Sequence, residues 1–411
     1  MAARPGQLPA GIEGTRVARH GRMTMLQGHS DLSPRVAIIS DTVDDTNGIA
    51  IGLRRFVAAS RHAGHEVSLV GAQRPGVVDE VVRMPAAMTA CLPIYPDMTW
   101  TVPELPALVA WLSRSADIVQ LASPGPLGIA GLIAARMLGL PVLAQYHTEV
   151  AEYAAQMTGL PMIRSIVEPI VGWFYKQADL CLAPSQAVED RLAALGVPGD
   201  RVCRVRRGVD LELFHPARRD RRALARYGIG DGPVALYVGR LSKEKNLGTL
   251  TAAWAAVHAQ RPDAHLLVVG GEGPLAGTLR GPGLIEAGGL YGAELAAVFA
   301  SADVFAFASE TETFGNVVVE AAASGLPAVV AAAGAAHEHV IDGVTGHVVE
   351  GRDPARIAGA VLRLFADPAA RARMGAAARE RVAGLGLDAA VRATWDIYAR
   401  FAPAAARKAA S

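Results

Sequence analysis

The sequence predicts an α/β protein built from two doubly wound domains that face each other across a cleft. Short apolar, β-rich runs alternate with helical patterns in two successive series along the 411 residues. Continuous apolar strands bounded by glycine are typical of parallel strands that are buried on both faces. At about 150 residues per domain the length corresponds to two or three domains. This estimate agrees with two series of nearly equal size.

The composition narrows the class of protein. Apolar residues make up 51% of the chain and charged residues 19%, which excludes global disorder. The 40 Lys and Arg residues balance 39 Asp and Glu residues, so bulk charge draws the chain neither to nucleic acid nor to an anionic membrane. We expect no nucleic-acid partner. The three cysteines, Cys91, Cys181 and Cys203, form no CxxC pair. They predict neither a disulfide framework nor a zinc site, and fit a reducing cytoplasm.

The N-terminal segment and the apolar runs carry no membrane signal of their own. Residues 1–34 are rich in Arg, Gly and Pro without periodicity, and we expect a disordered tail there. No apolar segment follows Met1, so no signal peptide is expected, and Met23 and Met25 are alternative starts. The longest charge-free run, residues 118–135, contains two prolines. It is interpreted as strand, loop and helix, not as a membrane span.

The first series is predicted to form an N-terminal domain over residues 35–213. It opens with the strand VAIIS at 36–40, followed by a helix over 48–62. The further strands are expected at 66–71, 117–123, 141–147, 180–185 and 202–209. The further helices are expected near 103–115, 128–138, 163–177 and 186–195.

The second series is predicted to form a C-terminal domain over residues 214–385. A loop rich in Pro, Arg and Asp precedes it, and the chain after about residue 352 has helical patterns only. We expect residues 386–411 to form a helix and tail that pack back toward the N-terminal domain. The carboxyl ends of the two sheets then face one cleft, which is where such folds bind ligands. The strands of this domain are expected at 234–240, 265–271, 302–309 and 326–332.

The segment ETETFGNVVVEAAASGLP at 310–327 carries the strongest functional signal. Glu312 and Glu320 are separated by seven residues, and the turn between them leads into a helix at Asn316. The free N–H groups and the positive dipole end of a helix N-terminus suit a phosphate or a sugar hydroxyl. Carboxylates accept paired hydrogen bonds from vicinal hydroxyls, so the two glutamates can contact different parts of one elongated ligand. A solvated capping acid and a helix-surface glutamate remain the alternative.

Two cations follow the first strand of the second series, in the segment VGRLSKEKNL. Arg240 offers a forked guanidinium and Lys245 a point charge, and together they can clamp a diphosphate. A solvated surface turn is the alternative.

The segment GEGP at 271–274 follows the next strand, where Gly271 lets the backbone approach a ligand closely. This segment is not a GxGxxG motif and is a weak signal alone.

Two segments of the first series add candidates. The loop DTVDDTNGIAIG at 41–52 brings Gly48 to the start of a helix, where it can border a diphosphate or an acceptor. A turn with capping residues is the alternative. His147 closes an apolar strand, so its imidazole is expected to point into the cleft for catalysis or substrate contact. A core histidine is the alternative there.

Two further segments carry weaker signals. His337 and His339 do not share a helix face, so no metal site is predicted. The aromatic run WFYK at 173–176 ends a helical pattern. Core packing is its main interpretation, and contact with a membrane or a hydrophobic acceptor stays open.

Together these segments resemble glycosyltransferase family 4, whose members are retaining enzymes of the GT-B fold. The resemblance covers about residues 35–400. Its ordered motifs are the glycine loop after the first strand, YHT at 146–148, APS at 183–185, GVDLELFHP at 208–216, GRLSKEKNL, GEGP and the spaced glutamates. The resemblance implies transfer of a hexose-type sugar from GDP-mannose or a UDP-hexose to a hydroxyl of a lipid, glycan or small metabolite. It also implies that neither a metal nor another cofactor is needed.

The resemblance assigns roles to residues of this chain. Arg240 and Lys245 would bind the donor diphosphate, and Glu320 would hold the ribose hydroxyls. Glu312 would hold the donor sugar, with His147 beside it on the opposite domain. His147, Glu312, Arg240 and Lys245 are the expected catalytic residues, which act through orientation and charge without a covalent enzyme nucleophile. The remaining implied donor contacts are Gly48, Gly271, Phe314, Gly315, Asn316 and Val317.

The chain departs from the family pattern at two places. Ala308 replaces the proline of the usual FPS, and Ala335 replaces the second glycine of the usual GG. Neither change affects the charged candidate residues, so an active enzyme is expected. Its expected location is the cytoplasm, and the inner face of the membrane is the alternative. The open alternatives are a nucleotide-sugar epimerase or hydrolase on the same fold and a non-catalytic nucleotide-sugar-binding protein. An NAD-dependent dehydrogenase is disfavoured, because no GxGxxG with a downstream acid occurs in a βαβ unit.

Overall fold

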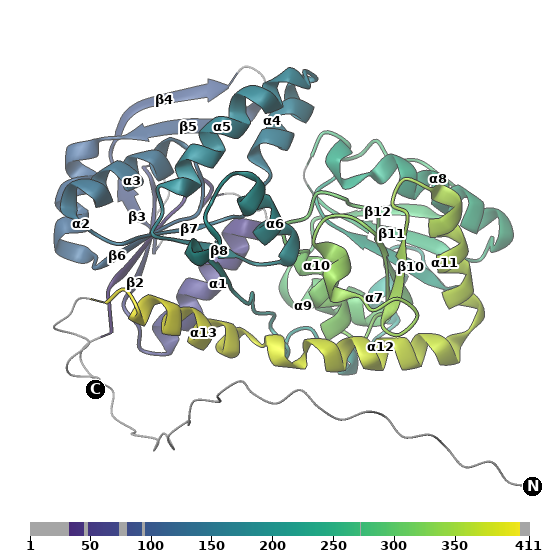
Figure 1. Cartoon of the computed structure of the whole chain (residues 1–411). Helices are drawn as coiled ribbons and strands as arrows, with labels where there is room; N and C mark the ends of the chain where they lie inside the picture. Colours follow the sequence, from purple (N-terminus) through teal and green to yellow (C-terminus); the bar gives the residue numbers. More distant parts are fainter. Residues whose placement is uncertain (1–32, 45–47, 74–79, 93–94, 272, 403–411) are drawn as a thin grey trace, which may run out of the picture.

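The computed structural model describes residues 33–44, 48–73, 80–92, 95–271 and 273–402. These residues form two α/β domains that lie side by side (Figure 1). The predicted disordered tail over 1–34 falls outside the described residues, apart from its last two. The same holds for residues 45–47 of the glycine loop and for residue 272 of the GEGP segment.

The N-terminal domain is built on a sheet of seven described strands in the order β3-β2-β1-β6-β7-β8-β9. Every pairing in this sheet is parallel, as predicted. All four residues of β1 are buried because helices cover both faces, which explains the continuous apolar runs in the sequence. The strands are β1 (Val36–Ile39), β2 (Val67–Ala72), β3 (Val82–Met84), β6 (Ile118–Leu121), β7 (Val142–Gln145), β8 (Leu180–Ala183) and β9 (Val202–Arg204).

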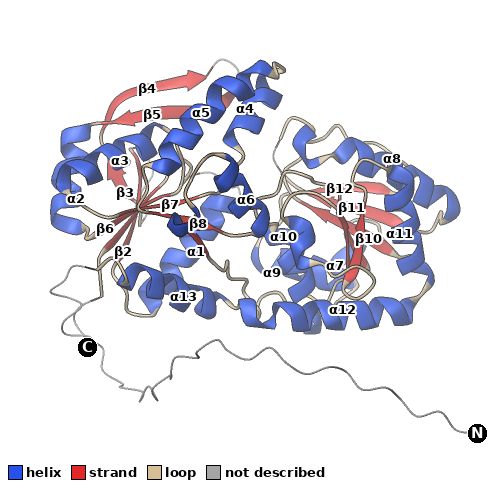
Figure 2. Cartoon of the chain, viewed as in Figure 1, coloured by secondary structure: helices blue, strands red, loops and turns tan. Residues whose placement is uncertain are grey.

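Helices cover the two faces of this sheet in separate groups. One face packs against α1 (Gly48–His62) and α13 (Leu387–Ala399). The helices on the opposite face are α2 (Leu105–Ser115), α3 (Pro126–Leu138), α5 (Met162–Lys176) and α6 (Gln186–Ala194). Outside this layer, α4 (Val150–Thr158) packs against α5, and an antiparallel hairpin of β4 (Ala86–Leu92) and β5 (Tyr95–Pro103) lies against α3 (Figure 2).

The C-terminal domain is built on a parallel sheet of six described strands in the order β12-β11-β10-β13-β14-β15. Its strands are β10 (Val234–Val238), β11 (His265–Val269), β12 (Leu284–Gly288), β13 (Val304–Phe307), β14 (Ala328–Ala331) and β15 (Gly346–Val349). Its helices are α7 (Arg222–Ala225), α8 (Leu247–Gln260), α9 (Gly292–Ser301), α10 (Asn316–Ala323), α11 (Pro354–Ala366) and α12 (Pro368–Val382).

Side-chain caps set several helix boundaries in both domains. Ser185 accepts a hydrogen bond from the backbone N–H of the third residue of α6. Asp353 and Asp367 accept from first-turn N–H groups of α11 and α12. Such caps satisfy the donors that a helix N-terminus leaves unpaired. They explain why the helical patterns begin where they do.

The chain crosses between the domains twice, and the two crossings touch. The backbone N–H of Val209 donates to the carbonyl of Leu385 at 2.8 Å, next to a parallel bridge between Val209 and Gly386. After the second crossing, α13 packs on α1 and the N-terminal sheet (Figure 1). Its Trp395 Nε1 donates to Ser60 Oγ at 3.0 Å. The last described helix therefore belongs in space to the N-terminal domain.

Candidate active site

A loop and a helix at the carboxyl end of the C-terminal sheet carry the two predicted carboxylates. The loop follows β13 and ends at Gly315, the N-cap of α10, whose φ is 87°. This left-handed conformation favours glycine, and a Cβ there would come 3.1 Å from the Cα of Ala336. Glu312 lies in the loop and Glu320 on the second turn of α10. The two carboxylates are thus held by different elements.

Lys245 and Glu312 form a buried ion pair. Lys245 ends a 3₁₀ turn (Lys243–Lys245) after β10, and its Nζ donates to Glu312 Oε1 at 2.6 Å. Ser309 Oγ donates to the same oxygen at 2.8 Å. Burial opposes both charges, but their mutual attraction outweighs it, so the pKa of Lys245 is raised and that of Glu312 lowered. Both of these contacts are made to Oε1, so a sugar hydroxyl would donate to Oε2.

Two other predicted residues, Arg240 and Gly271, also lie at the carboxyl end of the C-terminal sheet. Arg240 follows β10, and the Tyr237 hydroxyl donates to its carbonyl at 3.0 Å. Gly271 follows β11, where a Cβ would come 3.0 Å from the backbone nitrogen of Gly289. On the other side of the cleft, burial raises the pKa of Tyr153 in α4, and the positive charge of Lys245 partly opposes this rise. The charge of Lys245 therefore acts across the cleft on a residue of the N-terminal domain.

Thr313 joins the carboxylate loop to the N-terminal domain. Its Oγ1 donates to the carbonyl of His147 at 2.8 Å, and its own carbonyl accepts from Ser185 Oγ at 2.9 Å. All three residues are buried. Glu338 makes a second connection, because its carboxylate accepts from the first two backbone N–H groups of α6 at 2.9 Å each. These contacts hold the loop against the strand end that carries His147.

A third contact crosses the cleft between α1 and α10. Arg55 Nη1 lies 3.4 Å from Glu320 Oε1. Burial raises the pKa of Glu320 to about 7, and Arg55 opposes this rise only in part. Nearby, a Cβ on Gly48 would lie 3.5 Å from Asn316 Nδ2. The predicted donor contacts of the two domains therefore meet at the α10 N-terminus.

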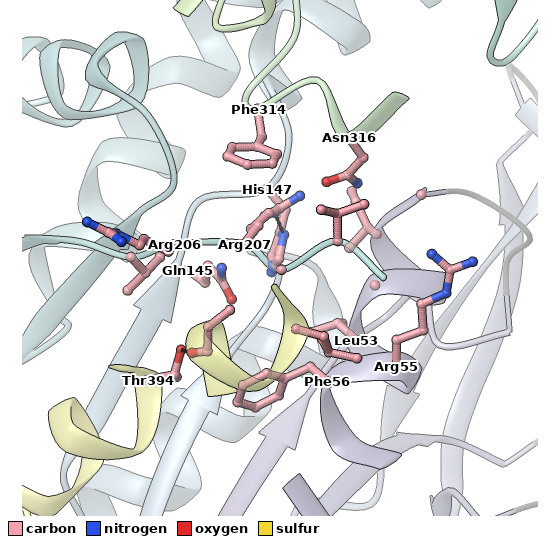
Figure 3. Close-up of a pocket in the computed structure, with 18 of the residues that line it drawn as sticks. Leu53, Arg55, Phe56, Gln145, His147, Arg206, Arg207, Phe314, Asn316 and Thr394 are labelled. Atoms are coloured by element: carbon pink, nitrogen blue, oxygen red, sulfur yellow. Dashed lines mark hydrogen bonds between the residues drawn. The ribbon is translucent and has the colours of Figure 1, made fainter. Parts of the chain in front are cut away.

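A cavity of about 110 Å³ lies between the domains (Figure 3). Figure 3 shows the wall that the N-terminal domain and α13 contribute, with Leu53 and Phe56 of α1 and Thr394 of α13. Ligand pockets usually enclose roughly 300–1,000 Å³, so we expect the domains to open further to admit a nucleotide sugar. The predicted residues that line the cavity are Gly48, His147, Phe314, Asn316 and Glu320.

The other predicted residues lie outside this lining. Arg240, Lys245, Glu312, Gly271 and Gly315 are at the adjacent loop ends of the C-terminal sheet. The side chain of Val317 packs against the C-terminal core.

Sequence patterns did not single out several residues that the structure places in the site. These residues are Arg55, Tyr153, Ser185, Arg207 and Thr313. Each acts through contacts between segments distant in the chain, which spacing and periodicity do not encode. The motif APS at 183–185 and the segment at 310–327 contain Ser185 and Thr313, but neither side chain was given a role.

The described residues contain no group of three or more His, Cys, Asp or Glu side chains placed to hold a metal ion. His339 Nε2 instead contacts the carbonyl of Phe314 at 2.8 Å, and burial lowers the pKa of this histidine to about 4. That the reaction needs no metal stays a prediction. As for membranes, the described part of the chain has no helix long and apolar enough to span one.

The fold and the facing charged groups define the class: a GT-B glycosyltransferase. Solved structures of that class have the same fold. Sucrose-phosphate synthase from Thermosynechococcus elongatus gives a TM-score of 0.71 at 24% identity, covering 89% of this chain and 98% of that one. The Anabaena Alr3699/HepE complex with UDP-glucose gives 0.71 at 17% identity, covering 89% and 100%. The prediction of two doubly wound domains is confirmed.

Sequence comparisons define the family. The model of glycosyltransferase family 4 matches residues 46–213, and that of group 1 glycosyl transferases matches residues 232–367. A GDP-mannose-dependent alpha-mannosyltransferase of Mycobacterium tuberculosis is 34% identical over 360 residues, covering 85% of this chain and 92% of the relative. The sulfoquinovosyl transferase SQD2 of Arabidopsis thaliana is 31% identical over 340 residues, covering 80% and 65%.

The chain belongs to glycosyltransferase family 4. It is a glycosyltransferase that uses a nucleotide sugar and an acceptor, which confirms the predicted enzyme class. The epimerase, hydrolase and non-catalytic alternatives are not favoured.

Proposed function

We propose that the enzyme is a retaining mannosyltransferase that moves mannose from GDP-mannose to an acceptor hydroxyl. The observation that carries this proposal is the buried Lys245–Glu312 pair beside the N-terminus of α10, opposite His147. GDP-mannose is favoured as donor because the relative at 34% identity is named for it. A UDP-hexose is the second candidate donor and is an outcome of the test below.

In this proposal Arg240, Lys245 and the α10 N-terminus bind the diphosphate. When the bond between the anomeric carbon and the phosphate oxygen breaks, negative charge grows on that oxygen. Lys245 stabilises the charge because Glu312 keeps its ammonium protonated. The N–H groups of the helix N-terminus add further donors at the same place. These residues supply the charge stabilisation that a metal ion supplies in other transferases, so we propose a reaction without metal or other cofactor.

The sugar and the acceptor meet between the domains. Glu312 Oε2 accepts from a sugar hydroxyl, and His147 contacts the sugar from the N-terminal domain. The acceptor oxygen bonds to the anomeric carbon on the face that the diphosphate leaves, and its proton passes to the leaving phosphate oxygen. No covalent bond to the enzyme forms. The contacts of Thr313 and Glu338 close the domains over the donor and exclude the water that would hydrolyse it.

Transfer from GDP-mannose tests the donor and the stereochemistry together. With a cell lipid and glycan extract as acceptor, we expect mannosylated product from GDP-mannose and little product from UDP-hexoses. NMR couplings of the isolated product are expected to report the α configuration of the donor. A β-linked product would contradict retention, and product from UDP-hexoses alone would contradict the choice of donor.

We also propose that the enzyme works at the cytoplasmic face of a membrane and contacts anionic lipid through α5. Met162, Ile166, Ile170 and Trp173 are exposed to between 44% and 65% and follow one another at helical spacing. Phe174 and Tyr175 of the same helix are core residues, so only part of the aromatic run faces outward. The exposed charged residues on α5 are Lys176 and Arg164, which also pairs with Glu152 at 3.5 Å and with Glu168 at 3.9 Å. An apolar stripe with flanking cations suits an anionic interface.

Vesicle co-sedimentation tests this contact. Wild-type protein is expected to bind phosphatidylglycerol vesicles more than phosphatidylcholine vesicles, and Ile166→Ser with Ile170→Ser is expected to reduce binding several-fold by removing buried apolar area. The matched control is Ile341→Ser with Val344→Ser. These two apolar side chains are similarly exposed but lie on the C-terminal domain. Unchanged binding of the α5 variant would contradict the proposal. A dimer that the α5 variant disrupts would assign the stripe to a second copy instead.

A further inference from the structure

Arg207 is a charged residue of the cavity that none of the family motifs assigns. It lies in the first crossing between the domains, just after β9. Its Nη2 contacts Nδ1 of His147, and its guanidinium carbon lies 5.7 Å from the centre of the Phe314 ring. Figure 3 shows Arg207 and His147 together below Phe314. The arginine therefore links the histidine of one domain to the carboxylate loop of the other.

The contact determines which nitrogen of His147 carries the proton. A guanidinium has only N–H donors, so Nδ1 must accept. Burial lowers the pKa of Arg207 to about 10, and Glu312 opposes this, so the guanidinium stays charged at neutral pH. Burial and then the charge of Arg207 lower the pKa of His147 well below 6.5, which makes the imidazole neutral. A neutral imidazole that accepts at Nδ1 carries its proton on Nε2.

The second nitrogen of His147 has no partner within the described residues. His147 is 7% exposed, and its Nε2 is buried without a hydrogen bond although the residue lines the cavity. A buried N–H is normally paired, so an orphan that faces a cavity points to a ligand. The other titratable or charged residues that line the cavity are Arg55, Arg206, Glu320 and Tyr398. Of these, Arg55 and Glu320 are engaged with each other, and Tyr398 with Gln120.

We propose that Arg207 is a positioning residue that holds His147 as the Nε2–H tautomer, so that the histidine donates one hydrogen bond to an oxygen of the substrate in the cavity. This inference rests on the proposed function, because the substrate is the nucleotide sugar or its acceptor. It has a mechanistic consequence. A protonated Nε2 cannot remove a proton from the acceptor, so His147 is a donor and not the general base.

Nitrogen NMR of histidine-labelled protein tests the tautomer without any activity assay. The two ring nitrogens of His147, assigned by their loss in His147→Gln, are expected to show a proton on Nε2 and a bare Nδ1 in the wild type. In Arg207→Met the tautomers are expected to mix, and the pKa is expected to move toward 6.5 because the donor and the positive charge are gone. A wild-type spectrum with the proton on Nδ1 would overturn the proposal even if Arg207→Met does not fold.

Kinetics test the consequence for substrate. Arg207→Met is expected to lower kcat by roughly 10-fold or more, as for loss of a charge-assisted hydrogen bond, with a new acidic limb in the pH profile. The matched control is Arg222→Met in α7, because the side chain of Arg222 is exposed and is not among the residues that line the cavity.

A second variant separates positioning from general damage. His147→Gln keeps an N–H donor at the position of Nε2. Adding Arg207→Met to His147→Gln is therefore expected to have little further effect on kcat. Additive losses would overturn the positioning role. If the wild type transfers no sugar, the proposed function fails, while the NMR result still decides the tautomer.

Discussion

Replacing Lys245 with methionine is expected to lower kcat/KM for sugar transfer by roughly 100-fold and to destabilise the fold. Loss of one charge-assisted contact to the diphosphate costs about 1.5–3 kcal/mol, or roughly 10–150-fold in rate. The variant also leaves Glu312 buried without its cation, and breaking a buried pair typically costs about 3–5 kcal/mol. Steady-state kinetics with the donor and urea unfolding measure the two effects.

Two further variants separate these effects. Lys243→Met removes the same charge from an exposed position two residues earlier and is expected to change neither quantity. Adding Glu312→Gln to Lys245→Met is expected to restore part of the stability, because no buried charge then lacks a partner, but not the rate. If Lys245→Met left both donor binding and turnover unchanged, the assignment of this site would be wrong.

At Glu320 we expect an effect on stability that depends on pH. Burial raises the pKa of this carboxyl from 4.5 to about 7, so the folded protein binds more protons than the unfolded chain between these values. The contribution of Glu320 to stability is therefore complete below the unfolded pKa and is lost as pH rises through the folded one. Glu320→Gln cannot ionise. Its stability relative to the wild type is expected to rise by roughly 2–3 kcal/mol between about pH 5 and pH 8, measured by urea unfolding.

The affinity for the donor nucleotide is expected to increase with pH, whereas the contribution of Glu320 to stability decreases. Ribose hydroxyls donate to the ionised carboxylate, so GDP is expected to bind the wild type more tightly as pH rises from about 6 to 8. Glu320→Gln is expected to lose this dependence and to bind GDP roughly 10-fold more weakly at the higher pH. Glu294→Gln, a surface change on α9, is the control. Equal GDP affinity of Glu320→Gln and wild type at both pH values would contradict the ribose contact.

The sequence predicted most of the fold because the central strands are buried on both faces. The runs VAII of β1 and VALYV of β10 are entirely buried and carry no polar alternation. The edge strands β12 and β15 were not predicted, because their short sequences LIEAG and GHVV are mainly half-buried and lack this signal. The hairpin of β4 and β5 was not predicted either, because it lies outside the sheet and helix layers.

The candidate site was predictable where one local segment carries it. Glu312 and Glu320 flank a single helix start, so their spacing predicted a ligand site, with a capping acid and a surface glutamate as the alternative. The partners of the site residues were not predictable, because they come from distant parts of the chain. Lys245 lies 67 residues from Glu312, Arg207 lies 60 from His147, and Arg55 lies 265 from Glu320. Only the packing of the two domains brings these charges together.

A thermal-shift titration of the wild type and Glu320→Ala tests most directly whether a nucleoside diphosphate sugar binds between the domains. The ligands are GDP, GDP-mannose, UDP, UDP-glucose and NAD. A ligand at about 100 times its Kd stabilises the folded state by about 2.7 kcal/mol, which corresponds to a Tm rise of about one degree or more for a chain of this size. We predict such a rise with GDP and GDP-mannose, and its loss in Glu320→Ala. No rise with any nucleoside diphosphate, or a rise with NAD alone, would contradict the proposed site.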